Sequence, residues 1–415
     1  MKLYHKNTLR NHLCCGLAIA SGLLCSQSLN AAEEILGVQV GGFLSQGYLI
    51  STDNDYLADS SKGSFDFREY GVNASKTFGA NWRIGAQVFG QKLGKYGNDK
   101  VTVDWAIVDY NFNQQFGIRA GRVKIPRGLY NESLDLEVTR PFVLLPQTFY
   151  DARLRDFNNA FNGGMFYGTF DLKSMGSLDY KAYFGDIQIR TTDSGVNDFF
   201  SAGNTAYSYD LGMDYTYGGQ LFWSTPLSGL RIGLSLSDFH NLYGSQLAPP
   251  PLTGIASVLI EINDYTRYVF SAEYFYEDWM FALEAGKEVA FAGVSVVNMP
   301  GPGPSTMPFG SVNISNRQLS LAVSRRINSW LEVGAYAGAI EGVAPSPSAI
   351  KYGADHCYDY ALSFRFDITS HLIFKIEGHY VDGTSMLFNL PDWPQPDFAR
   401  EPEWFYFASK LTFHF

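Results

Sequence analysis

Apolar and polar side chains alternate without a break in the stretch LRIGLSLS, from Leu230 to Ser237. Leu and Ile fill its even positions, and Arg, Gly and Ser fill its odd positions. Successive side chains of a β-strand point to opposite faces, so the pattern predicts a strand with one apolar and one polar face. The same alternation recurs in Arg267 to Tyr276, Gln318 to Arg326, Tyr358 to Asp367 and Leu372 to Tyr380.

About sixteen such segments can be identified, each of roughly 9 to 15 residues, the length that a tilted membrane-spanning strand needs. The connections between them alternate in length. The seven short ones are Gly79 to Asn81, Asn113 to Gln115, Asp171 to Ser177, Pro226 to Gly229, Glu277 to Asp278, Ile327 to Ser329 and Thr369 to His371. The eight long ones are Thr52 to Lys62, Leu93 to Lys100, Ile125 to Asn158, Ile187 to Gly212, Asn241 to Asp264, Ala292 to Asn316, Gly342 to Cys357 and Asp382 to Pro402.

This order predicts an all-β fold, a 16-stranded antiparallel transmembrane β-barrel with short periplasmic turns and longer extracellular loops. Soluble sandwiches and propellers also alternate, but their water-facing strands carry Lys, Glu or Thr outside, whereas the outer face here is apolar. Aromatic residues gather beside the short turns, as Phe78, Trp82, Trp279 and Trp330 do, which is typical of a membrane interface. Aromatics make up 16% of the chain and Gly occurs 41 times, which disfavours an all-α protein.

The first 31 residues are expected to be a secretory signal peptide, followed by a barrel over residues 32–415. Lys2, Lys6 and Arg10 precede an apolar run from Leu13 to Cys25 that is too short to span a bilayer. The expected mature chain keeps one cysteine, so no internal disulfide can hold it. Together with the strand pattern, this favours the Gram-negative outer membrane. The net charge of −10 argues against a nucleic-acid partner.

The last strand places apolar residues at alternate positions and ends in an aromatic residue. At this point the sequence resembles the Gram-negative porins. More loosely, the segment Gly121 to Tyr130, at the entry to the third long connection, resembles the same region of some substrate-selective porins. The resemblance implies a trimer in a bilayer with lipopolysaccharide. It also implies that the barrel-assembly machinery reads the final strand, through Phe407, Leu411, Phe413 and Phe415.

A sixteen-stranded barrel encloses a water-filled lumen, which something must narrow if the channel is to select. The longest connection, about residues 125–158, follows the fifth strand, where porins fold a loop inward. Rows of opposite charge across the gap would then orient polar solutes. We expect a weak charge selectivity with a mild preference for cations, and we expect the wall arginines to face the loop acids. The candidate constriction residues are Arg83, Arg119, Arg127, Glu132, Asp135, Glu137 and Arg140.

Two alternatives stay open for the loop: it could cover the barrel from outside, and its arginines could serve only as structural ion pairs. An enzyme is not expected, because no G-x-S-x-G, P-loop or H-E-x-x-H motif occurs, and neither a cofactor nor a metal site is expected. A transporter with an internal plug domain has no room before the first strand. The sequence therefore predicts a passive channel for small hydrophilic solutes, and the alternative is a structural or adhesin-like barrel.

Overall fold

The computed structural model describes residues 33–190, 192, 194–201, 208–247, 257–297, 306–342, 353–387 and 400–415. Residues 1–31, the expected signal peptide, lie outside this range. Within it, no helix is both long and apolar enough to cross a membrane.

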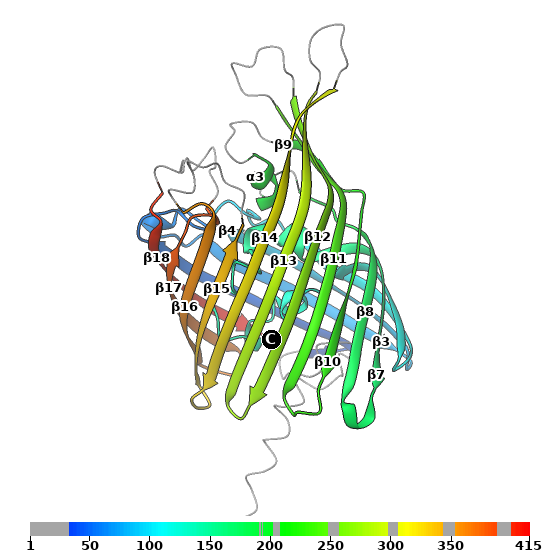
Figure 1. Ribbon diagram of the computed structural model, residues 1–415. Coiled ribbons are helices and arrows are strands. Elements are labelled where there is room, and N and C mark those ends of the chain that lie inside the picture. The colour runs from blue at the N-terminus through cyan, green and yellow to red at the C-terminus, as the bar shows by residue number, and fades with distance from the viewer. Residues whose placement is uncertain are drawn as a thin grey trace, which may run out of the picture.

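Sixteen antiparallel strands of the described residues form one closed sheet (Figure 1). They are β2 (Val38–Ser51), β3 (Phe67–Phe78), β4 (Trp82–Leu93), β5 (Thr102–Asn113), β6 (Phe116–Lys124), β7 (Ala160–Asp171), β8 (Ser177–Asp186), β10 (Tyr215–Ser224), β11 (Leu230–Leu247), β12 (Ser257–Tyr276), β13 (Trp279–Val297), β14 (Thr306–Arg326), β15 (Leu331–Glu341), β16 (His356–Asp367), β17 (Leu372–Asp382) and β18 (Glu403–His414). Each strand pairs with its neighbour in sequence, and β18 pairs with β2 to close the ring.

The closure runs to the last residue. Phe415 and Gly42 exchange two backbone hydrogen bonds of 3.0 Å, one in each direction. Two short strands supplement the ring: β1 (Glu33–Ile35) pairs with β2, and β9 (Ser208–Gly212) continues the line of β10 along β11. The closed ring leaves no sheet edge in the membrane, where an unpaired backbone group costs several kcal/mol.

Short helical segments lie in the connections. The 3-10 helices are η1 (Ser60–Lys62), η2 (Asn131–Ser133), η3 (Glu137–Thr139), η4 (Ala152–Leu154) and η5 (Lys173–Met175), and the α-helices are α2 (Arg155–Asn158) and α3 (Gly195–Ser201). Three of the 3-10 helices and α2 belong to the long connection between β6 and β7.

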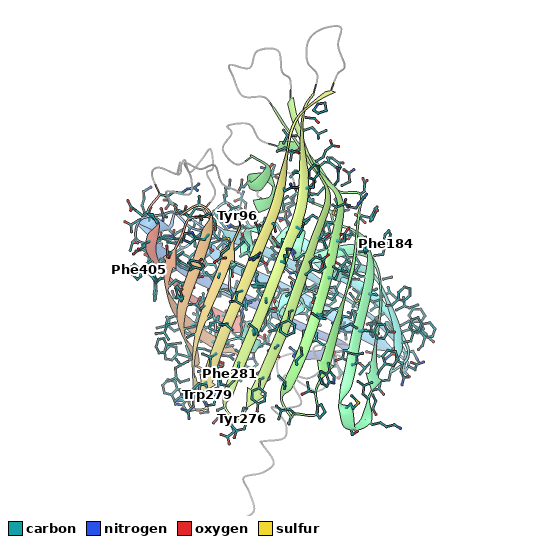
Figure 2. All side chains as sticks on the ribbon, in the orientation of Figure 1. Tyr96, Phe184, Tyr276, Trp279, Phe281 and Phe405 are labelled. Atoms are coloured by element: carbon teal, nitrogen blue, oxygen red, sulfur yellow. The ribbon has the colours of Figure 1, made fainter. Side chains whose placement is uncertain are left out.

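The two faces of the wall differ as the alternation predicts. Leu234 and Leu236 are exposed on the outside, whereas Ser235 and Ser237 between them are buried inside. Aromatic rings line the turn end of the wall; Tyr276, Trp279 and Phe281 are at the lower rim in Figure 2. Near another turn, the ring centroids of Trp82 and Tyr110 lie 4.6 Å apart. The outward face is therefore suited to lipid, and the inward face to water and polar side chains.

Four strands are longer than the sequence analysis expects. β11, β12, β13 and β14 have 18, 20, 19 and 21 residues and rise above the rest of the barrel (Figure 1). The prediction of loops over Asn241 to Asp264 and Ala292 to Asn316 was therefore wrong for most of their described residues. These strands stay paired where the alternation breaks, because the register shifts by a single residue there, as between Ile262 and Asp264.

Candidate functional site

The connection from Ile125 to Asn159 lies inside the barrel and is bonded to the wall at separate strands. Near its start, the backbone N–H of Leu129 donates to Glu284 of β13 at 2.9 Å. In its middle, the N–H groups of Val143 and Leu144 donate to Glu377 of β17 at 2.9 and 3.1 Å. The expected inward fold of the third long loop is confirmed, and the alternative of a loop outside the barrel is excluded. We call this segment the lumen loop.

The lumen loop folds inward because its sequence supplies apolar side chains along with the charges. Phe142, Val143, Leu144, Leu145 and Phe149 are all buried. They pack against apolar side chains that face into the lumen from the wall. Burial of apolar surface of this kind stabilises by about 25 cal/mol per Å². The loop is therefore packed like a small core, and its polar groups are fixed by that packing.

Glu137 is the centre of a buried charge cluster. Its carboxylate lies 2.5 Å from Arg140, 2.6 Å from Lys375 of β17 and 2.9 Å from Lys410 of β18. Burial alone would raise the pKa of Glu137, but the charges of Arg140, Lys375 and Lys410 outweigh it and hold this pKa well below its usual range. Glu137 is thus ionised and ties the loop to two adjacent strands.

Asp135 is the centre of a second cluster, against the wall of β4, β5 and β6. It lies 2.6 Å from Arg155, forms an ion pair with Lys124, and accepts a hydrogen bond of 2.9 Å from the side-chain amide of Gln87. Asp104 completes the cluster, 2.7 Å from Arg155. Burial acts to raise the pKa of Asp135, and the charges of Arg155 and Lys124 lower it below its usual range.

The remaining predicted loop residues have different surroundings. Glu132 forms an ion pair with Lys181 of β8. Arg127 is buried and donates to the Asn131 side chain at 3.1 Å, with its guanidinium over the Tyr150 ring. Its Nε has no hydrogen-bond partner, and no carboxylate among the described residues lies within 4 Å. Burial, assisted by the charge of Arg267, lowers the pKa of Arg127 to about 10.

Arg83 and Arg119 take other positions than the sequence analysis expects. The Arg119 guanidinium binds Asp109 on the neighbouring strand at 2.9 Å and lies over the Tyr167 ring. Arg83 is the second residue of β4, close to the turn, and it is the cross-strand partner of Asp109. Among the described residues, the loop acids bind Lys181, Lys124, Arg155, Arg140, Lys375 and Lys410. The predicted acids are thus paired with cations, but not with Arg83 and Arg119 as expected.

Two further acids, Glu284 and Glu377, hold the loop backbone, a role that was not predicted for them. The Tyr150 hydroxyl donates to Glu284 at 2.8 Å, so that one carboxylate binds a backbone N–H and a hydroxyl from different parts of the loop. Glu377 likewise accepts two successive backbone N–H groups. Both acids occupy inward positions, which the alternation could mark. Their partners are backbone groups, which carry no signal in the sequence.

A cavity of about 780 Å³ opens between the lumen loop and the wall formed by β4, β5, β6, β9, β11 and the segment that follows β8. The charged side chains that line it are Lys100, Asp104, Arg122, Arg153, Arg155, Asp156 and Arg190. Its apolar lining includes Ile189, Leu211, Met213 and Tyr243. We call this space the vestibule. Its size falls within the range of small-molecule sites.

One group of the described residues has the donor atoms for a metal ion. Asp238, His240 and Asp264 bring their ligand atoms within 4.8 Å of one another on β11 and β12. These atoms already have partners, because Nδ1 of His240 lies 3.1 Å from Asp264 and the Thr266 hydroxyl donates to Asp238 at 2.7 Å. The group is separate from the lumen loop.

Comparison with known sequences identifies no family and no function for this chain. No family model matches the chain. An uncharacterized protein of Aquifex aeolicus is 25% identical over 150 residues, a stretch that is 35% of this chain and 31% of that protein. The match therefore spans about a third of the relative and carries no function.

Solved structures give the fold. The anion-selective porin of Comamonas acidovorans is 12% identical and covers 91% of this chain and 99% of its own, with a TM-score of 0.53. The outer-membrane channel DcaP of Acinetobacter baumannii is 9% identical, covers 95% and 100%, and has a TM-score of 0.51. The trimer form of OmpT, an outer-membrane protein of Vibrio cholerae, is 13% identical, covers 93% and 100%, and has a TM-score of 0.50. Because these identities are low, the likeness concerns the barrel itself.

Proposed function

We propose that this chain, which has the closed sixteen-strand fold of the outer-membrane porins, is a passive channel for small hydrophilic solutes and ions. The observation that carries the proposal is the lumen loop, which crosses the barrel and is held by ion pairs and by buried acids. A loop fixed in this way narrows the lumen without any moving part, which suits diffusion better than gated transport. Arg127, Glu132, Asp135, Glu137 and Arg140 belong to this constriction, and Arg83 and Arg119 line the wall below it.

The charge selectivity that we propose is weak. None of the three predicted loop acids lacks a cation: Asp135 shares Arg155 and Lys124 with Asp104, and Glu137 binds three cations, one of which, Lys410, also binds Glu69. An enzymatic role is not part of the proposal.

The proposed setting is the Gram-negative outer membrane, after removal of residues 1–31. We propose a homotrimer, by analogy with the trimer form of OmpT, to which this chain is similar. Lipid and lipopolysaccharide would contact the outward apolar face, and the barrel-assembly machinery would recognise Phe407, Leu411, Phe413 and Phe415. Chemical crosslinking of the detergent-extracted protein tests the trimer.

Conductance of the purified protein in planar lipid bilayers tests the proposal directly. Stable ohmic steps that grow with salt concentration are expected. Silence at all voltages would favour a second candidate, an adhesin-like or structural barrel. That candidate has one observation of its own, the extension of β11 to β14 above the rest of the barrel (Figure 1).

A further inference from the structure

The vestibule contains an excess of unpaired positive charge. Arg155 and Lys124 together neutralise Asp104 and Asp135, and Arg153 binds Asp151 at 2.7 Å. Three cations of the lining, Lys100, Arg122 and Arg190, have no carboxylate within 4 Å among the described residues. The remaining acid of the lining is Asp156. Three cations against one carboxylate leave a cavity that attracts anions.

Arg122 and Arg190 are held side by side by one strand. Nε of Arg122 donates to the carbonyl oxygen of Asp104 at 3.1 Å, and Nη2 of Arg190 donates to the hydroxyl of Thr102 at 3.0 Å. Thr102 and Asp104 are two residues apart on β5, so the anchor points are separated by about 7 Å at the ordinary rise of a strand. Each guanidinium keeps further N–H groups for another acceptor, because a guanidinium has five.

Part of the vestibule lining is apolar. Ile189 and Met213 are half-buried, Leu211 is buried, and the ring of Tyr243 completes this side. Ile189 and Met213 pack on the apolar cluster around Phe161 and Phe239. A solute in the vestibule therefore meets the cations Arg122 and Arg190 and also an apolar surface, made by Ile189 next to Arg190 and by residues in and beside β9 and β11.

We infer that the vestibule is a binding site for small organic carboxylates with an apolar body, held by Arg122 and Arg190 and packed against Ile189, Met213 and Tyr243. The inference rests on the proposed function, because it names the solute class that the channel would collect. A carboxylate accepts bidentate hydrogen bonds from a guanidinium, and these are stronger than hydrogen bonds between neutral groups. The apolar lining adds affinity only for a solute that has an apolar group to pack against it.

Four probes separate the two parts of the inference: benzoate, benzamide, acetate and inorganic phosphate. Isothermal titration of the detergent-purified wild-type chain measures binding without any need for conduction. Benzoate is expected to bind saturably and more tightly than each of the other three. Benzamide lacks the charge, and acetate and phosphate lack the apolar body. Equal binding of benzoate, acetate and phosphate would overturn the inference, because a plain anion atmosphere explains that result.

Variants locate the site. The double variant Arg122→Gln/Arg190→Gln is expected to weaken benzoate binding by about tenfold or more, the loss typical of a charge-assisted contact. The control is Arg325→Gln, which removes one positive charge, against two in the double variant, beside the Trp279 ring and near the short turn that joins β12 and β13. An equal loss in the control would assign the effect to net charge and overturn the inference. If the double variant does not fold, the probe series on the wild type still decides.

Conductance distinguishes this inference from the proposed function. Benzoate is expected to reduce single-channel current in the wild type and to do so less in the double variant. Absence of benzoate binding in a conducting channel would overturn the site and leave the porin proposal intact. Benzoate binding in a protein that never conducts would contradict the channel and leave the site.

Discussion

The ammonium nitrogen of Lys375 lies 2.6 Å from a carboxylate oxygen of Glu137, and this contact joins β17 to the lumen loop. Both groups are buried, and Lys410 and Arg140 bind the same carboxylate. Burying charges costs free energy that their mutual attraction only partly returns, but removal of one partner leaves the others uncompensated. The loop is therefore expected to behave as a fixed part of the barrel.

Replacing Glu137 with Gln removes the carboxylate that three buried cations share. We expect a loss of about 3–5 kcal/mol, the usual cost of breaking a buried ion pair. In detergent the transition temperature of the heat-induced gel shift should fall, and in bilayers the current should become noisier as the loop detaches. Glu277→Gln, in the exposed turn before β13, is the matched control. An unchanged transition in Glu137→Gln would show that the cluster does not anchor the loop.

Replacement of two buried arginines of the loop should change stability by very different amounts. Arg155→Met leaves Asp104 and Asp135 with less compensation and should cost about 3–5 kcal/mol. Arg127→Met leaves no carboxylate behind and relieves a buried cation whose pKa burial has lowered to about 10, so its effect should stay within about 1 kcal/mol. Thermal unfolding of the two proteins in the same detergent gives the comparison. Similar large losses in both would contradict the assignment of Arg127 as unpaired.

The ion pairs of Asp135 and Glu137 also determine the lowest pH at which the lumen loop stays attached to the wall. The folded-state pKa values of Asp135 and Glu137 are both lowered, so their contribution to stability is complete above the unfolded carboxyl pKa of about 4. It is lost as the pH falls from there toward the folded-state values. We expect constant conductance from about pH 8 to about pH 5 and loop detachment only below about pH 4. A transition near neutral pH would contradict this sign.

Glu132 offers the mildest test of charge selectivity. Its side chain is 24% exposed and pairs with Lys181, so Glu132→Gln adds one uncompensated positive charge to the lumen with little strain. The reversal potential in a salt gradient should shift toward anions by a few millivolts, since the pore field depends on such unpaired charges. An identical reversal potential in wild type and variant would mean that this pair does not line the narrow zone.

Phe415 should matter more for assembly than for stability. Its ring is on the outward face, and its backbone is bonded to Gly42 whichever side chain it carries. We expect Phe415→Ala to lower the amount of protein in the outer membrane several-fold, while the purified barrel melts at nearly the same temperature. Phe405→Ala, another exposed ring on β18, is the control. Equal amounts of the two variants would remove the special role of the last residue.

The sequence by itself determined the barrel. Alternation fixes which face of a strand is apolar, because successive side chains point to opposite sides, and the LRIGLSLS stretch obeys this rule in the structure. Strand number and the antiparallel order followed from segment lengths, and the inward third loop followed from the resemblance to porins. The lengths of β11 to β14 did not, because register shifts let pairing continue where the alternation breaks.

Only the tertiary structure decided which charges meet. The acids of the lumen loop could be named from their positions, but Glu137 meets Lys375 and Lys410 from strands more than two hundred residues away. Alternation predicts that a lysine faces the lumen. It does not predict the position of that lysine along the barrel axis or around the circumference. That depends on strand tilt, register and the path of the loop, which are properties of the closed sheet. For the same reason Arg119 was assigned to the loop acids, whereas the closed sheet places it beside Asp109.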